Sequence, residues 1–397
     1  MYMSIPLLKQ LKTLKGKRVL VRVDFNVPVK RKKILDDTKL LASLPTIQFL
    51  IKKRAKIVLV THFGRPGGKK NSALKVDVIG KRLEELLGQR VYKLNVWKGK
   101  MANRAVQELE ESGVMLLENI RFDKQEKNNT GDLAKELAQL ADIFVLDGFA
   151  VAHRTDASIV GVAEHLPSYA GLLLEKEIKG LDKVLDNPKK PFVVALGGIK
   201  IKTKIPVIKQ LLPTADHILI GGGLFNTYLK AAGYFIGSSV IDKDMEKLAL
   251  YYCKRKKVIT PVDVVVGNFK GTKMRVVDIG KKPHVICKRG EAILDIGPKT
   301  IQLFAGYLKE AKTLAWNGAM GYFEQAPYDI GTKSIARVIA SRSKGRAYGI
   351  IGGGETIQAM DLVGMKDDID LVSTGGGAML QYLGGKSLDA IEALGGK

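Results

Sequence analysis

Basic side chains stand at the ends of apolar runs in the first half of the chain, whereas glycine clusters occupy the same positions in the second half. The basic residues are Arg22, Lys39, His62, Arg65, Arg121 and Arg154. They suit a small anionic ligand, because a guanidinium group matches the geometry of carboxylate and phosphate oxygens. The glycine clusters are Gly197-Gly198, Gly221-Gly222-Gly223, Gly352-Gly353-Gly354 and Gly375-Gly376-Gly377. Glycine lets backbone N–H groups approach phosphates closely, so the sequence predicts an anion site in its first half and a nucleotide site in its second.

The composition is that of a globular protein. The chain has 397 residues, 46% of them hydrophobic and 26% charged, and this length supports two domains with separate cores. No apolar run approaches the roughly 20 residues that span a bilayer. Residues 1–10 lack the basic and then apolar layout of a signal peptide. We therefore expect no membrane partner and a cytoplasmic location.

The formal net charge of +25 favours anionic partners and makes nucleic acid a hypothesis to weigh. The basic runs at residues 30–33 and 254–257 are short and carry no interleaved aromatic side chains that could stack on bases. We interpret these runs as solvated basic faces and expect no nucleic acid as the main partner.

Short β-branched runs alternate with stretches of helical spacing. The runs predict strands at residues 18–23, 56–60, 143–146, 192–196, 217–220, 311–315 and 347–351. The helical stretches include residues 76–87, 133–140 and 332–341. This alternation predicts parallel sheets with crossover helices, in which ligands bind at the loops beyond the carboxyl ends of the strands. The basic residues and the glycine clusters both fall at such loops.

A further helix is predicted over residues 172–185, before Asn187-Pro188 ends its pattern. This helix could join two α/β units and support a hinge. The pattern alone is equally consistent with a surface helix inside one domain.

The common nucleotide-binding fingerprints are absent from the sequence. Gly297-Pro298-Lys299-Thr300 resembles the end of a P-loop, but no glycine stands at the required earlier position, and no GxGxxG motif follows a strand. A phosphate site in this chain must therefore be of another kind.

Several segments resemble, in order and in spacing, those of phosphoglycerate kinases. They are Val21-Arg22-Val23-Asp24-Phe25-Asn26-Val27-Pro28, His62-Phe63-Gly64-Arg65-Pro66, Leu116-Leu117-Glu118-Asn119-Ile120-Arg121-Phe122, Ala152-His153-Arg154, Leu196-Gly197-Gly198-Ile199-Lys200, Trp316-Asn317-Gly318, Gly352-Gly353-Gly354 and Ser373-Thr374-Gly375-Gly376-Gly377-Ala378. The resemblance extends from near residue 18 to the carboxyl terminus.

This resemblance implies an α/β fold of two domains, each a Rossmann-like parallel sheet flanked by helices, joined by a hinge helix. The expected domains are an N-terminal 3-phosphoglycerate-binding domain at residues 1–170 and a C-terminal nucleotide-binding domain at residues 189–382. The linker helix is expected at residues 171–188, and residues 383–397 are expected to pack back on the first domain.

In the first half, the resemblance implies a site for 3-phosphoglycerate. Its implied substrate-binding residues are Asp24, Asn26, Lys39, His62, Arg65, Arg121 and Arg154. Without the resemblance, Asp-x-Asn after a strand reads as an ordinary turn, and an isolated arginine as a surface charge. The task of such a cluster is to bind and orient the substrate.

In the second half, the resemblance implies a site for ATP or ADP. Its implied nucleotide-binding residues are Gly198, Lys200, Lys204, Gly222, Gly223, Asn317, Glu324, Gly352, Gly353, Gly354, Glu355 and Thr356. Lys200 would contact the transferring phosphoryl group, Lys204 the nucleotide phosphates and Glu324 the ribose. The catalytic residues implied are Lys39, Lys200, Gly354 and Gly377, and Glu355 would bind Mg²⁺. Taken alone, the lysines would be solvated surface residues and each glycine triplet a flexible turn.

Four positions depart from the usual family pattern. Lys39 stands in place of an arginine and loses the planar fork while keeping the charge. Glu355 replaces an aspartate beside the metal and keeps a hard oxygen ligand. Ala319 replaces a proline, and Phe225 a small residue, in the nucleotide pocket. Because both catalytic departures keep their charge, we expect a working kinase.

The expected activity is that of a phosphoglycerate kinase, acting as a monomer on 3-phosphoglycerate and ATP with Mg²⁺. Phosphoryl transfer of this kind depends on alignment and charge neutralisation, and closure of the domains would exclude water. Two other hypotheses remain open. One is a basic nucleotide- or nucleic-acid-binding protein without turnover, and the other is a related acyl-phosphate kinase acting on a different small acid.

Overall fold

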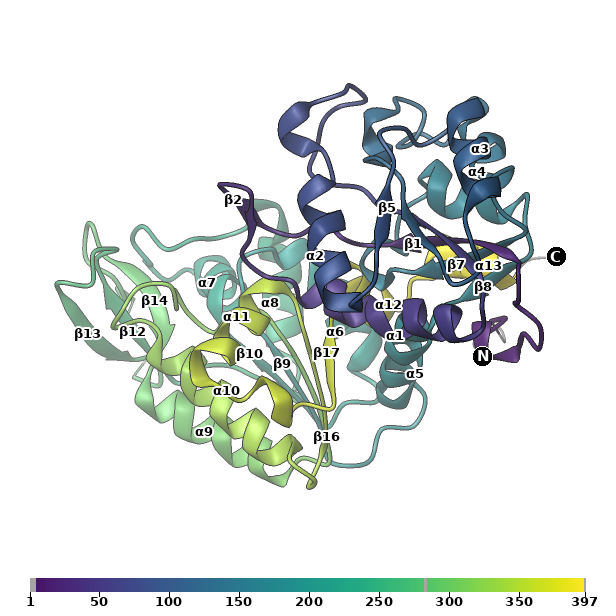
Figure 1. Cartoon of the computed structure of the whole chain (residues 1–397). Helices are drawn as coiled ribbons and strands as arrows, with labels where there is room; N and C mark the ends of the chain where they lie inside the picture. Colours follow the sequence, from purple (N-terminus) through teal and green to yellow (C-terminus); the bar gives the residue numbers. More distant parts are fainter. Residues whose placement is uncertain (1–4, 282–283, 396–397) are drawn as a thin grey trace. The chain divides into compact units, whose positions relative to one another are not determined.

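The computed structural model describes residues 5–281 and 284–395, which fall into two compact units (Figure 1). The first unit takes the described residues up to Ile178 together with those from Ser387 onward, and the second takes Lys179–Lys386. The division falls inside helix α5 (Leu172–Leu185). Residues 396 and 397, the end of the segment expected to return to the first domain, lie outside the described residues.

The first unit is built on a parallel sheet with the strand order β5-β6-β4-β1-β7-β8. Its strands are β1 (Arg18–Val23), β4 (Lys56–Val60), β5 (Val91–Lys93), β6 (Val114–Leu116), β7 (Ile143–Asp147) and β8 (Ser168–Ala170), with a separate hairpin of β2 (Val29–Lys30) and β3 (Lys33–Ile34). Its helices are α1 (Thr38–Lys52), α2 (Asp77–Leu87), α3 (Lys100–Glu108), α4 (Leu133–Ala138) and α13 (Asp389–Gly395), besides the start of α5. Short helical turns are η1 (Leu8–Gln10), η2 (Ser72–Leu74), η3 (Ile120–Phe122), η4 (Phe149–Val151) and η5 (Ala157–Gly161).

The second unit contains another parallel sheet, of order β11-β10-β9-β15-β16-β17, and a small antiparallel sheet, β13-β12-β14. Its strands are β9 (Phe192–Leu196), β10 (His217–Ile220), β11 (Val258–Ile259), β12 (Asp263–Gly267), β13 (Met274–Asp278), β14 (Ala292–Ile296), β15 (Thr313–Asn317), β16 (Tyr348–Gly352) and β17 (Leu371–Ser373). Its helices are α6 (Ile205–Leu211), α7 (Gly222–Ala231), α8 (Glu246–Cys253), α9 (Pro298–Glu310), α10 (Ile330–Ser343), α11 (Gly354–Val363) and α12 (Gly376–Leu383), besides the end of α5. Short turns are η6 (Ile201–Thr203), η7 (Lys243–Met245) and η8 (Lys366–Asp368).

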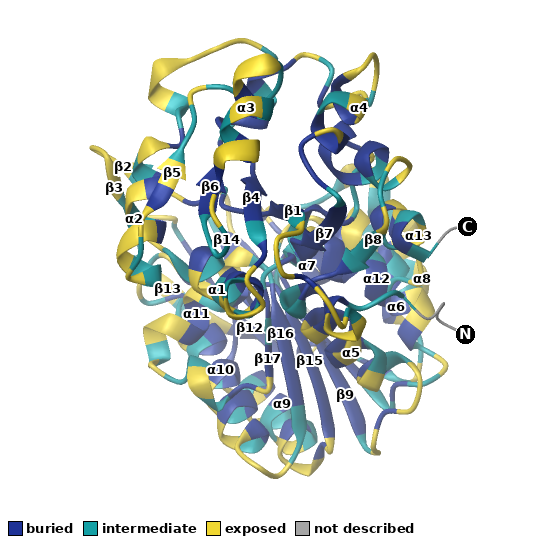
Figure 2. Ribbon diagram, turned by 45° about the vertical axis from the view of Figure 1, so that its right-hand side comes forward, coloured by how far each residue is buried: buried dark blue, intermediate teal, exposed yellow. Residues whose placement is uncertain are grey.

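The central strands of both parallel sheets are covered on both faces. Strands β7, β9 and β15 are buried at every residue, and Figure 2 shows them in dark blue. Continuous apolar runs such as Phe192–Leu196 form such strands because helices pack on both faces of a parallel sheet. Burial of each valine or leucine side chain, relative to its exposure to water, stabilises the folded state by about 1.5–3 kcal/mol. The α/β fold class predicted from the sequence is therefore confirmed.

The predicted strands at 18–23, 56–60, 192–196 and 217–220 are confirmed to the residue. The prediction at 311–315 was placed two residues early, since β15 is Thr313–Asn317. Ala311 instead caps helix α9, where its N–H donates to Leu308 O. The apolar pattern there continues across the junction between helix α9 and strand β15, so it does not mark where the strand begins. Strand β16 likewise begins one residue later than predicted.

The topology gathers loops that are far apart in the sequence, because the carboxyl ends of parallel strands share one edge of a sheet. In the first unit these are the loops after β1, β4, β6 and β7, and in the second the loops after β9, β10, β15, β16 and β17. In the described part of the chain, no helix combines the length and apolar character needed to cross a bilayer.

Candidate functional site

In the first unit, the loop after β1 and the start of α1 bring a carboxylate and an ammonium group together. Lys39 Nζ donates to Asp24 Oδ2 at 2.6 Å. Asn26 Oδ1 accepts a hydrogen bond of 2.9 Å from the N–H of Gly64, so Asn26 connects the loop after β1 to the loop after β4. Both polar residues of the Asp-x-Asn motif thus face neighbouring loops of one edge.

His62 lies buried at the centre of this edge. Its Nδ1 is 3.3 Å from Arg22 NH2 and 3.7 Å from Asp24 Oδ1, and its Nε2 is 3.3 Å from Arg154 NH1. Burial first, and then the charges of Arg22, Arg121 and other cations, lower the pKa of His62 well below its usual value. The imidazole is therefore neutral at physiological pH. Since a neutral ring has one acceptor nitrogen, it can accept from only one of the two arginines.

Arg22 is a residue that the sequence-based site omitted from its substrate-binding set. It is fully buried; its Nε donates to Ser158 Oγ at 2.8 Å, and its NH2 lies 3.9 Å from Glu126 Oε1. Burial lowers the pKa of Arg22, and Glu126 is the largest opposing influence. The available signal was an arginine inside the otherwise apolar run of β1, because a buried arginine requires partners.

The remaining predicted arginines meet around a cavity of about 830 Å³. Arg65, Arg121 and Arg154 line it, together with His153. Arg121 NH1 donates to Gly64 O at 3.0 Å, which fixes the guanidinium group at the cavity wall. All seven of the substrate-binding residues predicted from the sequence thus lie at the same edge of the first unit's sheet.

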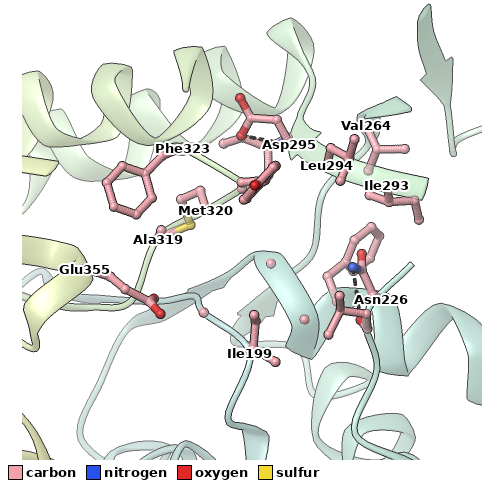
Figure 3. A pocket seen from close by; sticks show the side chains of 18 of the residues that line it. Ile199, Asn226, Val264, Ile293, Leu294, Asp295, Ala319, Met320, Phe323 and Glu355 are labelled. Atoms are coloured by element: carbon pink, nitrogen blue, oxygen red, sulfur yellow. Dashed lines mark hydrogen bonds between the residues drawn. The ribbon is translucent and has the colours of Figure 1, made fainter. Parts of the chain in front are cut away.

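In the second unit, the glycine loops border a pocket of about 290 Å³ (Figure 3). Five of the predicted nucleotide-binding residues line it, namely Gly198, Gly222, Gly223, Glu324 and Glu355. Phe225 and Ala319, two of the departures from the family pattern, line it as well. Figure 3 shows Val264, Ile293 and Leu294 at the opposite end of the pocket from Glu355. The pocket therefore has an apolar end, formed by the antiparallel sheet, and an end beside the glycine loops.

Hydrogen bonds link Lys204 to Asn317 and Asn317 to Gly352, and Thr356 bonds to the neighbouring Gly318. The ammonium group of Lys204 contacts Asn317 Oδ1, and Asn317 Nδ2 donates to Gly352 O at 2.6 Å. Thr356 Oγ1 accepts from the N–H of Gly318 at 2.7 Å. Burial lowers the pKa of Lys204 to about 8, although Glu355 raises it and Lys200 lowers it further.

Lys200 is placed differently from Lys204. It is exposed in the loop after β9 and does not line the pocket, but its charge reaches Lys204. Lys200 is thus close enough to Lys204 for their charges to interact, but it is not part of the pocket wall.

The predicted glycines are of two structural kinds. A Cβ added at Gly222 would lie 2.9 Å from Gly198 N, and one at Gly353, whose φ is 96°, would lie 2.9 Å from Asn317 Nδ2. These glycines allow loops to pack against each other. A Cβ at Gly354 or Gly377 would meet nothing within 4 Å. These two residues stand at the starts of α11 and α12, where unpaired N–H groups favour anions.

Glu355 offers a single carboxylate for a metal ion. A Cβ built on Gly198 would lie 3.0 Å from Glu355 Oε2, so this side chain reaches the loop after β9 at the pocket wall. Among the described residues, no group of three or more His, Cys, Asp or Glu side chains could hold a metal by itself. One hard oxygen ligand, supplemented by phosphate oxygens and water, is the donor set that Mg²⁺ commonly takes with nucleotides, so the residues present fit that ion.

Comparison with known proteins gives one consistent family. A family model described as phosphoglycerate kinase matches residues 8–386. The chain is 46% identical over 391 residues to a phosphoglycerate kinase of Thermosipho africanus, covering 97% of this chain and 96% of that protein. It is 43% identical over 387 residues to one of Pelotomaculum thermopropionicum, covering 96% of each. The solved phosphoglycerate kinases of Coxiella burnetii and Pyrococcus horikoshii match with TM-scores of 0.85 and identities of 37% and 32%, each covering 98% of both chains.

Proposed function

The chain belongs to the phosphoglycerate kinase family, which are phosphotransferases with a carboxyl group as acceptor, and we propose that it catalyses the reversible reaction of 1,3-bisphosphoglycerate and ADP to 3-phosphoglycerate and ATP. We infer that it depends on Mg²⁺ and serves glycolysis and gluconeogenesis as a cytoplasmic monomer. The observation that carries the proposal is that one chain holds an arginine-lined cavity and a glycine-bordered pocket at strand ends that suit the two substrates.

The arginine cluster would hold 3-phosphoglycerate. Arg65, Arg121 and Arg154 present guanidinium groups to the cavity, where a phosphate would take bidentate hydrogen bonds. The neutral ring of His62 would donate or accept one hydrogen bond without adding charge. Asp24 and Asn26 would contact the hydroxyl and carboxylate end of 3-phosphoglycerate. Both lie on the loop after β1, where Asp24 pairs with Lys39 and Asn26 bonds to Gly64.

The second unit would hold the nucleotide. The apolar end of its pocket suits an adenine ring, with Gly222 and Gly223 on its wall and Glu324 available to the ribose hydroxyls. The backbone N–H groups of Gly354 and Gly377, at the starts of α11 and α12, would donate hydrogen bonds to phosphate oxygens. Glu355 would hold Mg²⁺, which when bound neutralises phosphate charge.

The reaction needs no protein nucleophile. The carboxylate of the substrate attacks the terminal phosphoryl group, so the protein must align the reactants and neutralise the charge on the equatorial oxygens. Lys39, which is partly exposed, and the exposed Lys200 supply cations for this task, and Lys204 adds a buried one. The lower pKa of Lys204 is consistent with a lysine whose full charge returns when phosphate binds.

The proposal is tested by a coupled assay with ATP, Mg²⁺ and 3-phosphoglycerate. We expect turnover that is lost in Arg121→Gln and in Lys200→Met, while both variants keep the wild-type circular dichroism. No turnover from folded wild-type protein would contradict the proposal. Activity with another small carboxylic acid would indicate a related acyl-phosphate kinase, and salt-sensitive retention on nucleic acid without turnover would favour a binding protein.

A further inference from the structure

Asp156 places a buried carboxylate between two of the arginines that line the first unit's cavity. The residue immediately precedes η5 and is 4% exposed. Its Oδ2 lies 3.9 Å from Arg121 NH2 and 3.9 Å from Arg154 NH1. These distances allow electrostatic attraction but are too long for direct hydrogen bonds.

The same Asp156 oxygen has no hydrogen-bond partner among the described residues, and Arg121 Nε also lacks one. An unsatisfied buried carboxylate oxygen carries a cost in free energy. The neighbouring acids differ in this respect. Glu126 accepts from Ser158 N at 2.9 Å and from Ser158 Oγ at 2.6 Å, and Asp123 accepts from Trp97 Nε1 at 3.0 Å.

The position of Asp156 has a direct electrostatic consequence. Arg121 and Arg154 repel each other, and an intervening carboxylate offsets that repulsion when no ligand is present. A phosphate group bound by the same arginines would take over this role. The carboxylate would then lie close to a second anion in a buried setting, where screening by salt is weak.

We propose that Asp156 is an internal competitor for the anion site: it neutralises Arg121 and Arg154 in the empty site and weakens the binding of a phosphate group there. The inference rests on the proposed function, because it takes the arginine-lined cavity as the site of the substrate phosphate. It adds an affinity-determining residue that lies beside the binding arginines and acts on them through its charge. A site weakened in this way releases its ligand faster, which suits a reaction that must run in both directions.

The test is the affinity of the full-length protein for inorganic phosphate and for 3-phosphoglycerate, measured by titration calorimetry without nucleotide. Asp156→Asn keeps the shape of the side chain and removes its charge. We expect both ligands to bind on the order of tenfold more tightly in this variant. Asp389→Asn is the matched control, because Asp389 lines the same cavity, is exposed, and forms no ion pair with an arginine of the described chain. Its effect should stay below about twofold.

Arg121→Gln separates this inference from the proposed function. Loss of phosphate binding in Arg121→Gln, together with tighter binding in Asp156→Asn, supports both. Loss in Arg121→Gln with unchanged or weaker binding in Asp156→Asn overturns the internal competitor alone and makes Asp156 a scaffold for the arginines. Unchanged binding in Arg121→Gln shows that the cavity is not the anion site. Asp156→Ser, which also removes the charge, carries the same test if the asparagine variant does not fold.

Discussion

Lys39 Nζ lies 2.6 Å from Asp24 Oδ2, so the first turn of α1 delivers its cation to a carboxylate at the carboxyl end of β1. Asp24 is nearly buried, whereas Lys39 keeps about a third of its side chain exposed, at 30%. This ion pair holds the ammonium group of Lys39 at the anion-binding edge, and the Asp24 carboxylate compensates its positive charge. Lys39 must therefore exchange one anionic partner for another if it assists phosphoryl transfer.

Replacement of Lys39 tests this role. We expect Lys39→Arg to match or exceed the wild-type kcat, because a guanidinium fork can keep Asp24 and contact a phosphoryl oxygen at once. Lys39→Met should lose about a hundredfold or more in kcat, the usual effect of removing one stabilising donor from the transition state. Steady-state assays at saturating substrates measure both. A large loss in the arginine variant would show that the site is adapted to lysine.

The two kinds of glycine predict opposite results of alanine substitution. A methyl group at Gly354 meets nothing within 4 Å and improves helix propensity at the start of α11. It would, however, stand where a phosphate approaches the helix. We expect Gly354→Ala to keep or raise the melting temperature and to raise the KM for ADP on the order of tenfold.

Gly318→Ala is the contrasting variant. Gly318 has a φ of 91°, and its added Cβ would lie 2.4 Å from Gly197 O. The backbone strain alone costs about 1–3 kcal/mol, so thermal unfolding should occur at a clearly lower temperature. Normal stability of Gly318→Ala, or normal ADP binding by Gly354→Ala, would contradict this division of the glycines.

Lys204 predicts proton uptake when nucleotide binds. Burial lowers its pKa to about 8, so near pH 8 about half of these side chains are neutral in the free protein. A polyphosphate favours the charged form, and affinity for ADP should therefore weaken as the pH rises above about 8. Calorimetric titration at pH 8 in buffers of different ionisation enthalpy measures the uptake directly. It should disappear in Lys204→Met, and an equal uptake in that variant would assign the proton to another group.

Glu355 predicts the dependence on Mg²⁺. Glu355→Gln removes the carboxylate that reaches the loop after β9, and we expect the Mg²⁺ concentration for half-maximal turnover to rise on the order of tenfold. Glu355→Asp, which keeps the charge, should stay near wild type. The affinity for ADP with and without Mg²⁺ gives a second measurement that needs no turnover. If the gain in ADP affinity from Mg²⁺ is the same in Glu355→Gln, this carboxylate does not bind the ion.

Three of the residues that the sequence identified stand just beyond strand ends. Asp24, His62 and Gly354 stand just beyond β1, β4 and β16, and a parallel sheet brings such positions to one edge whatever lies between them. The local hydrophobic pattern, which predicts where strands end, was therefore sufficient to place these residues at the binding edge of a sheet. Their identification as one site also needed the resemblance, because each residue alone has an ordinary structural explanation.

The features that the sequence did not reveal depend on tertiary contacts. Arg22 bonds to Ser158, which is 136 residues away. Asp156 acquires its role because Arg121, which belongs to another loop, lies beside it together with the nearby Arg154. The antiparallel strands β12 and β14, which supply the apolar wall of the nucleotide pocket, were not predicted at all. Their short apolar runs carry no signal that distinguishes a second sheet from an additional strand of the first.

The buried, neutral ring of His62 predicts a pH dependence of stability. The unfolded chain binds a proton on this ring below about pH 6.5, whereas in the folded protein its pKa is lowered well below that value by burial and by Arg22, Arg121 and other cations. Between the two pKa values only the unfolded state carries the proton, so the free energy of unfolding decreases as the pH falls below about 6.5, by up to about 1.4 kcal/mol per pH unit. The matching NMR expectation is a His62 ring signal that shows no titration step at the ordinary histidine pKa of about 6.5, assigned by its absence in His62→Gln. The difference in unfolding free energy between wild type and His62→Gln should shrink over the same range, and a ring signal that titrates near 6.5 would contradict the buried neutral state.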